Sequence, residues 1–180
     1  MKIISGIYKG RNLTGFNIDG TRPTQDRVKE SVFSSIQAYI PDAVVLDLFA
    51  GSGNLGLEAL SNGSKFAYLN DFNKKAVSAI KKNIELLKVE NAKVLELDYK
   101  KALNYFKENN ITFDVVFLDP PYKDKIIEET VTYLLDNNLL NDEAIIICEY
   151  EHDFNDKFDR LEIIKEKKYG YKFVKILAKI

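Results

Sequence analysis

Short runs of apolar residues alternate along the chain with longer segments in which apolar residues recur every three or four positions. The first pattern predicts buried strands, and the second predicts amphipathic helices. The clearest helix is expected over Lys74–Leu87, where Ala76, Ile80 and Ile84 share one face. Strands are expected at Val44–Phe49, Phe66–Leu69, Val94–Leu97, Val115–Leu118 and Ala144–Cys148. Strands separated by helices require a mostly parallel sheet with helices on both faces, an α/β fold.

Further helical segments complete this alternation, and one helix precedes it. Thr24 is expected to cap an N-terminal helix with Asp26 in its first turn, and Pro41 is expected to end it. Its apolar face holds Val28, Val32, Ile36 and Ile40. The other helices are expected around Leu55–Leu60, Ala102–Phe106 and Ile126–Leu135.

Both ends of the chain are expected to add β structure. Residues 2–16 are rich in β-branched and aromatic residues interrupted by glycines, which predicts a β-hairpin that turns near Lys9-Gly10. The segments Leu161–Ile164 and Tyr171–Ile176 have no helix between them. They are expected to form an antiparallel pair that closes one edge of the sheet.

The composition, with 46% hydrophobic and 29% charged residues in 180, is that of an ordinary globular protein. We expect effectively one domain, with an extension over residues 1–40 and a core over residues 41–180. No apolar run reaches the ~20 residues of a membrane span, and the N-terminus does not resemble a secretory signal. A cytoplasmic location without a membrane partner is therefore expected. A single cysteine, Cys148, and a single histidine, His152, exclude a thiolate or multi-histidine metal site, so no metal is expected.

Charge is distributed unevenly although the net charge is only −1. Residues 1–40 carry a balance of +3 and residues 156–180 a balance of +4, so the segment between them is strongly acidic. Two basic ends can hold a polyanion against one face of a nearly neutral fold. An ordinary lysine-rich surface explains the charge pattern equally well.

A glycine-rich loop follows the first core strand, at the edge where parallel sheets bind ligands. The segment Asp47–Gly56 contains the pattern G-x-G-x-x-G at Gly51, Gly53 and Gly56. Asp71 lies twenty residues after Gly51, where an acid that binds ribose is expected. This spacing fits both an enzyme that binds NAD and a methyltransferase that binds a nucleoside.

Asp47 favours the methyltransferase, because a carboxylate beside the loop would repel a pyrophosphate and attract the sulfonium and amino groups of S-adenosylmethionine. Asp71 can accept hydrogen bonds from the ribose, and Asp98 from the adenine amine. Each aspartate alone could instead cap a helix or a turn. Together they predict a pocket for S-adenosylmethionine, formed by Asp47, Phe49, Ala50, Gly51, Gly53, Asp71, Phe72, Asp98 and Tyr99.

The sequence Asp119-Pro120-Pro121-Tyr122 follows the strand expected at Val115–Leu118. Two prolines remove two N–H donors, so this turn presents carbonyl oxygens and a carboxylate as acceptors. An aromatic ring beside them can stack on a planar base. We therefore expect Asp119, Pro120, Pro121 and Tyr122 to hold an exocyclic amine in line with the methyl donor. The alternative is a rigid turn with a packed tyrosine.

With these motifs in place, the sequence resembles the RsmD family of bacterial 16S rRNA (guanine-N2)-methyltransferases. The resemblance covers nearly the whole chain and rests on the segments Ile4–Arg11, Thr21–Glu30, Phe49–Leu60 and Asp119–Tyr122, in this order. It implies a Rossmann-like class I methyltransferase fold and S-adenosylmethionine as the cofactor. It also implies that the enzyme methylates the N2 amine of a guanine in 16S rRNA, alone or in a 30S assembly intermediate. The family more often has glutamate where this chain has Asp71, and either acid can accept both ribose hydroxyls.

Two groups of residues are assigned to the substrate. The resemblance places Arg22, Thr24 and Arg27 in the cleft between cofactor and substrate. Tyr8, Lys9 and Arg11 lie together near the expected hairpin turn, where basic and aromatic side chains can contact RNA. The protein is expected to act as a monomer.

Other functions remain open from the sequence. The same four-residue motif would serve an adenine-N6 methyltransferase that acts on RNA or DNA. An NAD-dependent oxidoreductase would satisfy the glycine pattern, although Asp47 and Asp119–Tyr122 have no role in it. A binding module with an inactive pocket is a third alternative.

Overall fold

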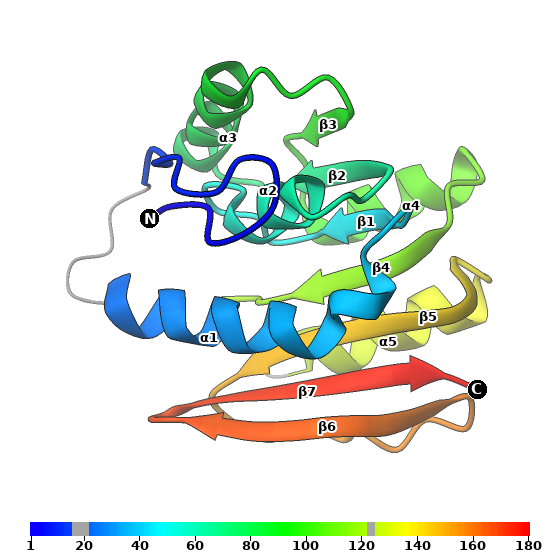
Figure 1. Ribbon diagram of the computed structural model, residues 1–180. Coiled ribbons are helices and arrows are strands. Elements are labelled where there is room, and N and C mark those ends of the chain that lie inside the picture. The colour runs from blue at the N-terminus through cyan, green and yellow to red at the C-terminus, as the bar shows by residue number, and fades with distance from the viewer. Residues whose placement is uncertain (16–21, 122–124) are drawn as a thin grey trace.

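The computed structural model of the chain describes residues 1–15, 22–121 and 125–180, and of residues 22–24 only the backbone. Within these ranges seven strands form one sheet in the order β3-β2-β1-β4-β5-β7-β6 (Figure 1). The strands are β1 Val44–Asp47, β2 Phe66–Asn70, β3 Ala92–Leu95, β4 Phe113–Leu118, β5 Leu140–Tyr150, β6 Leu161–Tyr169 and β7 Lys172–Lys179. The helices are α1 Arg22–Ile36, the 3-10 turn η1 Gln37–Tyr39, α2 Asn54–Ser61, α3 Lys74–Leu87, α4 Tyr99–Glu108 and α5 Ile126–Asp136. None of the helices in the described part of the chain has the length and hydropathy needed to cross a membrane.

The sheet is mostly parallel and has one antiparallel edge. Strands β1 to β5 pair in parallel, whereas β7 runs antiparallel to both β5 and β6. Strand order reverses between β1 and β4, since β2 and β3 lie on one side of β1 and the later strands lie on the other. The expected α/β fold with an antiparallel C-terminal edge is confirmed.

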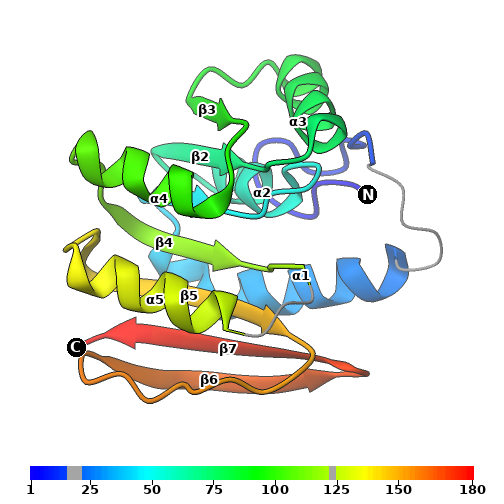
Figure 2. The same ribbon diagram turned by 180° about the vertical axis from the view of Figure 1, so that it is seen from behind.

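Helices cover both faces of this sheet (Figures 1 and 2). Helices α1, α2 and α3 contribute to one buried core and helices α4 and α5 to the other. Because side chains alternate across a strand, β4 serves both layers: Val115 and Phe117 face the first core, and Val116 and Leu118 face the second. The apolar runs of the sequence are therefore strands buried on both sides.

Several element boundaries differ from those expected. Strand β1 ends at Asp47 rather than Phe49, and β3 spans Ala92–Leu95 rather than Val94–Leu97. Helix α1 begins at Arg22, so Thr24 lies in its first turn and is not the N-cap that we expected. Pro23 is compatible with this start, because the first turn of a helix needs no N–H from it. The helix also ends before Pro41, at Ile36, and continues as the short η1 turn.

The expected N-terminal hairpin is only partly correct. An antiparallel bridge joins Lys2 to Asn12, and the Ile3 and Arg11 backbones are hydrogen bonded, but residues 1–15 contain no regular strand. We call residues 1–15 the N-terminal arm. It is held against α2 because the Ile7 N–H donates to the Ser61 carbonyl and the Tyr8 N–H to the Ser61 hydroxyl. Helix α2 therefore replaces the partner strand that the arm lacks.

A buried ion pair also fixes the arm. Lys29 of α1 and Glu58 of α2 are both about 1% exposed, and their charged atoms are 2.9 Å apart. Glu58 accepts hydrogen bonds from the Ile4 and Ser5 N–H groups, and Lys29 donates to the Lys2 carbonyl. The arm, α1 and α2 therefore share one buried polar network.

Candidate active site

The ends of β1 and β4 form the point where strand order reverses. These strands are neighbours, with Asp47 of β1 opposite Phe117 of β4, and Asp119 follows the end of β4. Asp47 and Asp119 therefore lie at the position where open parallel sheets bind ligands. The structure brings together the two segments that we predicted to hold the cofactor and the target amine.

The glycine loop connects β1 to α2 by a sharp turn. Gly51 and Gly53 have φ angles of 59° and 85°, which residues with a side chain rarely adopt. Gly56 lies in the first turn of α2, where a Cβ atom would be 2.1 Å from the Leu69 Cδ2 atom. The glycines thus allow the turn and the close packing of α2 on β2.

The Asp47 side chain is hydrogen bonded to the end of this loop. Its side chain is buried, and its Oδ2 atom accepts a hydrogen bond from the Gly56 N–H at 3.0 Å. Burial raises the pKa of Asp47 to about 7, opposed by the Gly56 hydrogen bond and increased further by the charges of Asp119 and Asp71. A nearby cation would stabilise the ionised carboxylate. This environment suits a positively charged ligand and disfavours a pyrophosphate.

Asp71 holds the loop from the side of β2. Its Oδ2 atom accepts from the Gly51 N–H at 2.9 Å, and its Oδ1 atom accepts from the Asn73 N–H at 2.9 Å. The next residue, Phe72, is 71% exposed, so its ring is presented to solvent beside the loop. The backbone bonds orient the Asp71 carboxylate, and its predicted contact with ribose stays a prediction.

Asn70 is a member of the site that sequence reasoning missed. Its buried amide donates to the carbonyls of Leu48 and Leu97 and accepts from the Leu97 N–H. The chain segments that follow β1 and β3 are thereby fixed to the end of β2. An asparagine at a strand end is a weak sequence signal, because it is also common in ordinary turns.

Asp98 caps α4 by accepting the Lys100 N–H at 3.0 Å, as the alternative interpretation of this residue anticipated. The neighbouring Tyr99 ring lies 5.6 Å from the Phe49 ring, and the Tyr99 hydroxyl donates to Glu129. Phe49, Tyr99 and Asp98 therefore line the same edge as the glycine loop. Contact of Asp98 with adenine stays a prediction.

Asp119 has two charged neighbours that sequence reasoning missed. The Lys172 ammonium lies 3.4 Å from both Asp119 carboxylate oxygens and 3.1 Å from Oε2 of Glu149. Glu149 follows the apolar part of β5, as Asp47 follows that of β1, so the same rule would have found it. Lys172 begins the antiparallel strand β7, and it approaches Asp119 because β7, rather than β6, pairs with β5, which the sequence does not reveal.

The remaining predicted residues of this site are placed as follows. Pro120 is half-buried and Pro121 is exposed, which keeps the turn after Asp119 at the surface. The predicted stacking residue, Tyr122, lies outside the described residues. Ala50 is buried, and its N–H donates to the Asn70 carbonyl.

The residues assigned to RNA are separated into two groups. In the N-terminal arm, Lys9 is exposed and Tyr8 is half-buried against the core. The Arg11 guanidinium donates to the Leu86 carbonyl of α3 at 2.7 Å, so it also has a structural contact. Arg27 is exposed on α1. The side chains of Arg22 and Thr24 lie outside the described residues.

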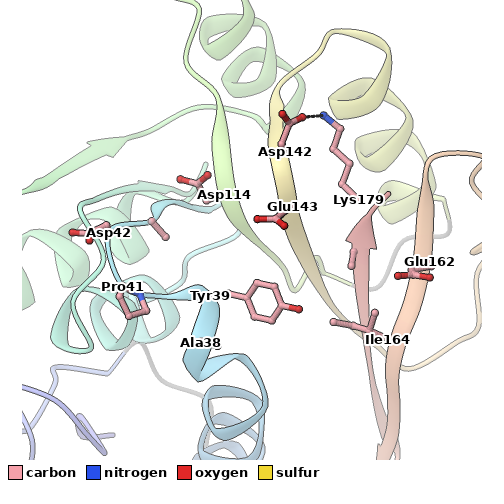
Figure 3. Close-up of a pocket in the computed structure, with 12 residues that line it drawn as sticks. Ala38, Tyr39, Pro41, Asp42, Asp114, Asp142, Glu143, Glu162, Ile164 and Lys179 are labelled. Atoms are coloured by element: carbon pink, nitrogen blue, oxygen red, sulfur yellow. Dashed lines mark ion pairs between the residues drawn. The ribbon is translucent and has the colours of Figure 1, made fainter.

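A cavity of about 510 Å³ lies at the opposite edge of the sheet, near the amino ends of the parallel strands (Figure 3). Its lining includes an ion pair between Asp142 and Lys179 and four further carboxylates, those of Asp42, Asp114, Glu143 and Glu162. An acidic surface of this kind repels nucleic acid. Within the described residues, no group of three histidine, cysteine or acidic side chains is arranged to hold a metal ion.

Comparison with known proteins assigns the chain to a family. A family model described as Conserved hypothetical protein 95 matches residues 1–178. The chain belongs to this family. Ribosomal RNA small subunit methyltransferase D of Haemophilus influenzae is 40% identical over 155 residues, which are 85% of this chain and 80% of that protein. The protein of the same name from Escherichia coli is 40% identical over 151 residues, which are 84% of this chain and 75% of that protein. The expected membership of the RsmD family is confirmed.

Solved structures agree with this assignment. The Escherichia coli protein yhhF superposes with a TM-score of 0.88 at 33% identity, and the alignment covers 99% of this chain and 97% of that one. The Thermus thermophilus protein TTHA0928 superposes with a TM-score of 0.82 at 26% identity, over 100% and 99% of the two chains. A more distant structure, the 16S rRNA N2 G1207 methyltransferase RsmC of T. thermophilus, has a TM-score of 0.68 at 17% identity and covers 91% of this chain and 44% of that one. It shows the fold, and the Rossmann-like class I methyltransferase architecture is confirmed.

Proposed function

We propose that this protein transfers the methyl group of S-adenosylmethionine to the N2 amine of a guanine in small-subunit rRNA. The observation that carries the proposal is the meeting of the Asp47 loop and Asp119 at the reversal of strand order. Relatives that are 40% identical are named ribosomal RNA small subunit methyltransferase D, which supports rRNA as the substrate.

The cofactor would bind along the carboxyl edge of β1, β2 and β3. The glycine loop leaves room for the methionine part, and Asp47 would lie close to its positive charges. Asp71, whose carboxylate is held by the Gly51 and Asn73 N–H groups, would accept hydrogen bonds from ribose, and the exposed Phe72 ring would pack against adenine. When it is bound, S-adenosylmethionine supplies an electrophilic methyl group.

Asp119 would act on the nucleophile. An exocyclic amine is a weak nucleophile, because its lone pair is delocalised into the ring. By accepting hydrogen bonds from this amine, the Asp119 carboxylate and the Pro120 carbonyl would favour a pyramidal nitrogen with its lone pair directed at the methyl group. The new C–N bond forms as the C–S bond breaks, sulfur keeps the electron pair, and the amine proton leaves towards Asp119 or solvent.

Substrate RNA would approach the carboxyl edge of the sheet. The N-terminus and the turn between β6 and β7 lie at this end, and the opposite edge carries the acidic cavity (Figures 1 and 3). The target base would have to leave its stack to reach Asp119. We also propose that the enzyme acts as a monomer, because the large apolar side chains exposed in the described residues are scattered over several elements.

The test is to incubate the enzyme with labelled S-adenosylmethionine and rRNA from a strain that lacks it, both as naked 16S rRNA and as 30S assembly particles. Nucleoside analysis should show N2-methylguanine at one mapped position, and the Asp119→Ala variant should serve as the inactive control. N6-methyladenine in either substrate would replace this proposal with the alternative activity. Calorimetry should show binding of S-adenosylhomocysteine, and tighter binding of NAD would contradict the methyltransferase assignment.

A further inference from the structure

Three charged side chains from neighbouring strands meet at the carboxyl edge of the sheet. Asp119 follows β4, Glu149 is near the end of β5, and Lys172 begins β7. The Lys172 ammonium contacts both carboxylates, at 3.4 Å and 3.1 Å. The side chains of Asp119, Lys172 and Glu149 are 37%, 22% and 9% exposed, respectively. Glu149 is therefore the innermost, buried side chain of this cluster, and Asp119 and Lys172 are accessible to a ligand.

The electrostatics keep Lys172 positively charged. Burial opposes this charge, but the Asp119 and Glu149 carboxylates raise the pKa of the Lys172 ammonium above its usual value. Glu149 is itself destabilised as an anion, because burial and the charge of Asp119 raise its pKa to about 8. Lys172 offsets part of that cost. The accessible surface of the cluster thus presents an acceptor at Asp119 beside a donor at Lys172.

An acceptor at Asp119 beside a donor at Lys172 complements the hydrogen-bonding groups of guanine and not those of adenine, the other purine with an exocyclic amine. On its Watson–Crick edge guanine has donors at N2 and N1 and an acceptor at O6. Adenine has a donor at N6, an acceptor at N1 and only a C–H group at the far end of this edge. With the amine held by Asp119, guanine offers an acceptor to a donor farther along the edge, whereas adenine offers none there.

We propose that Lys172 donates a hydrogen bond to O6 of the target guanine, with Glu149 as the positioning residue that holds its ammonium beside Asp119. This inference rests on the proposed function and extends it, because it identifies the residues that select guanine over adenine. A site that donates a hydrogen bond to one substrate discriminates against an analogue that lacks the acceptor. Glu149 limits the movement of Lys172, so that its donor is already in place before the base enters.

The experiment removes the O6 atom from the substrate and the donor from the enzyme. Once the methylated guanine has been mapped, synthetic RNA fragments are made with guanine or 2-aminopurine at that position. 2-Aminopurine keeps the C2 amine and lacks both O6 and the N1 proton, so the part of the rate difference that Lys172 supplies is the part that a Lys172 variant removes. In single-turnover assays the parent enzyme should methylate the guanine fragment about 10- to 100-fold faster, the range for one charge-assisted hydrogen bond. Lys172→Met should slow guanine methylation, leave the 2-aminopurine rate nearly unchanged and so lower the ratio of the two rates towards parity.

The ratio of the guanine rate to the 2-aminopurine rate distinguishes recognition of O6 by Lys172 from a purely structural role of Lys172. If Lys172 only neutralises buried carboxylates, Lys172→Met slows both fragments by the same factor and the parental ratio persists, which overturns the inference. Lys172→Arg keeps a charged donor and should retain most of the discrimination. Lys168→Met is the matched control, because Lys168 lies on the neighbouring strand with its ammonium over the Phe173 ring. It should change both rates by the same factor.

A second variant keeps the inference testable if Lys172→Met does not fold. Lys172→Met leaves Glu149 without its partner, and an uncompensated buried charge is destabilising. The double variant Lys172→Met/Glu149→Gln removes both charges, and it should also lower the ratio of the guanine rate to the 2-aminopurine rate. The parental ratio in this variant would overturn the inference. Failure of the proposed function is seen separately, as absence of methylation of the guanine fragment by the parent enzyme.

Discussion

Asp119 has different surroundings from the aspartates of the cofactor pocket. Asp47 and Asp71 accept hydrogen bonds from the glycine-loop backbone, whereas the contacts of Asp119 are to the end of a lysine side chain. Asp119→Ala should therefore bind S-adenosylmethionine as the parent does and lose methyl transfer by ~10²–10⁴-fold, the range for a positioned acid–base group. Single-turnover rates with bound RNA measure the chemical step apart from binding.

The conservative change Asp119→Asn provides the control for this prediction. Its amide oxygen can still accept one hydrogen from the amine, so its activity should fall less than that of Asp119→Ala. Calorimetry with S-adenosylhomocysteine checks that both variants keep the cofactor pocket. A parental methylation rate in Asp119→Ala would show that the proposed mechanism is wrong.

Asp47 makes stability and cofactor binding depend on pH. Its pKa is raised from 3.8 to about 7, so between these values the folded protein holds a proton on Asp47 that the unfolded chain has lost. The contribution of Asp47 is therefore fully present below the lower pKa and is lost as pH rises through the higher one. The free energy of unfolding should fall by up to ~1.4 kcal/mol per pH unit across this interval. Asp47→Asn should lack this part of the slope, which urea unfolding at a series of pH values measures.

Cofactor affinity should depend on pH in the opposite direction. The positive charges of S-adenosylmethionine favour ionised Asp47, so the affinity of the parent should rise as pH increases through about 7. Asp47→Asn should show a flatter profile by calorimetry. Equal profiles for parent and variant would remove Asp47 from the charge recognition of the cofactor.

Among the elements, the packing of α1 and α2 depends on the buried pair Lys29–Glu58. Lys29→Met leaves Glu58 buried without a cation, although Glu58 keeps its hydrogen bonds to Ile4 and Ser5. We expect a decrease of about 3–5 kcal/mol in the free energy of unfolding, measured with urea. The double variant Lys29→Met/Glu58→Gln should recover part of that decrease, because it removes the uncompensated charge. Additive effects would show that the two side chains are not energetically coupled.

Most elements could be predicted from the sequence because periodicity is a local property. The periodicity predicts a helix over Lys74–Leu87, which forms α3, and each expected core strand is present. The errors at the ends of β1 and β3 occur where a side chain replaces the backbone hydrogen bonds between strands. Asn70 binds the Leu48 carbonyl and both polar groups of the Leu97 backbone, so β1 and β3 end earlier than their apolar runs. The apolar pattern of the sequence therefore predicts where these strands lie, and it does not predict the Asn70 hydrogen bonds that end them.

The candidate site was predictable to a similar extent. Asp47, Asp71 and Asp119 could be placed at one edge, because the carboxyl ends of parallel strands lie together. Lys172 could not, since it reaches Asp119 only through the antiparallel pairing of β7 with β5. Lys29 and Glu58 were also missed, because charged residues 29 positions apart carry no pattern that indicates a shared buried contact.

At the scale of the whole molecule, charge separates the two edges of the sheet. The turn between β6 and β7 places the exposed Lys167 and Lys168 near the carboxyl edge, and the opposite edge carries the acidic cavity with the Asp142–Lys179 pair (Figure 3). A polyanion is attracted by the first edge and repelled by the second. The molecule thus orients RNA toward Asp119 although its net charge is close to zero.

The N-terminal arm carries two exposed basic residues, Lys9 and Arg11, and we expect it to supply part of the affinity for RNA without contributing to cofactor affinity. In the double variant Lys9→Gln/Arg11→Gln, fewer counterions are released on binding, so RNA binding should weaken. The slope of log affinity against log salt should flatten by about 0.7–0.9 for each RNA phosphate that the variant no longer neutralises.

The matched control is Lys179→Gln/Arg160→Gln, which removes the same two kinds of charge near the acidic edge, where both residues form ion pairs at the surface. Its slope should equal that of the parent, and calorimetry should show unchanged cofactor affinity in both variants. Equal slopes for the arm variant and the parent would show that Lys9 and Arg11 do not contact RNA, and that the Arg11 bond to the Leu86 carbonyl of α3 is the function of this part of the arm.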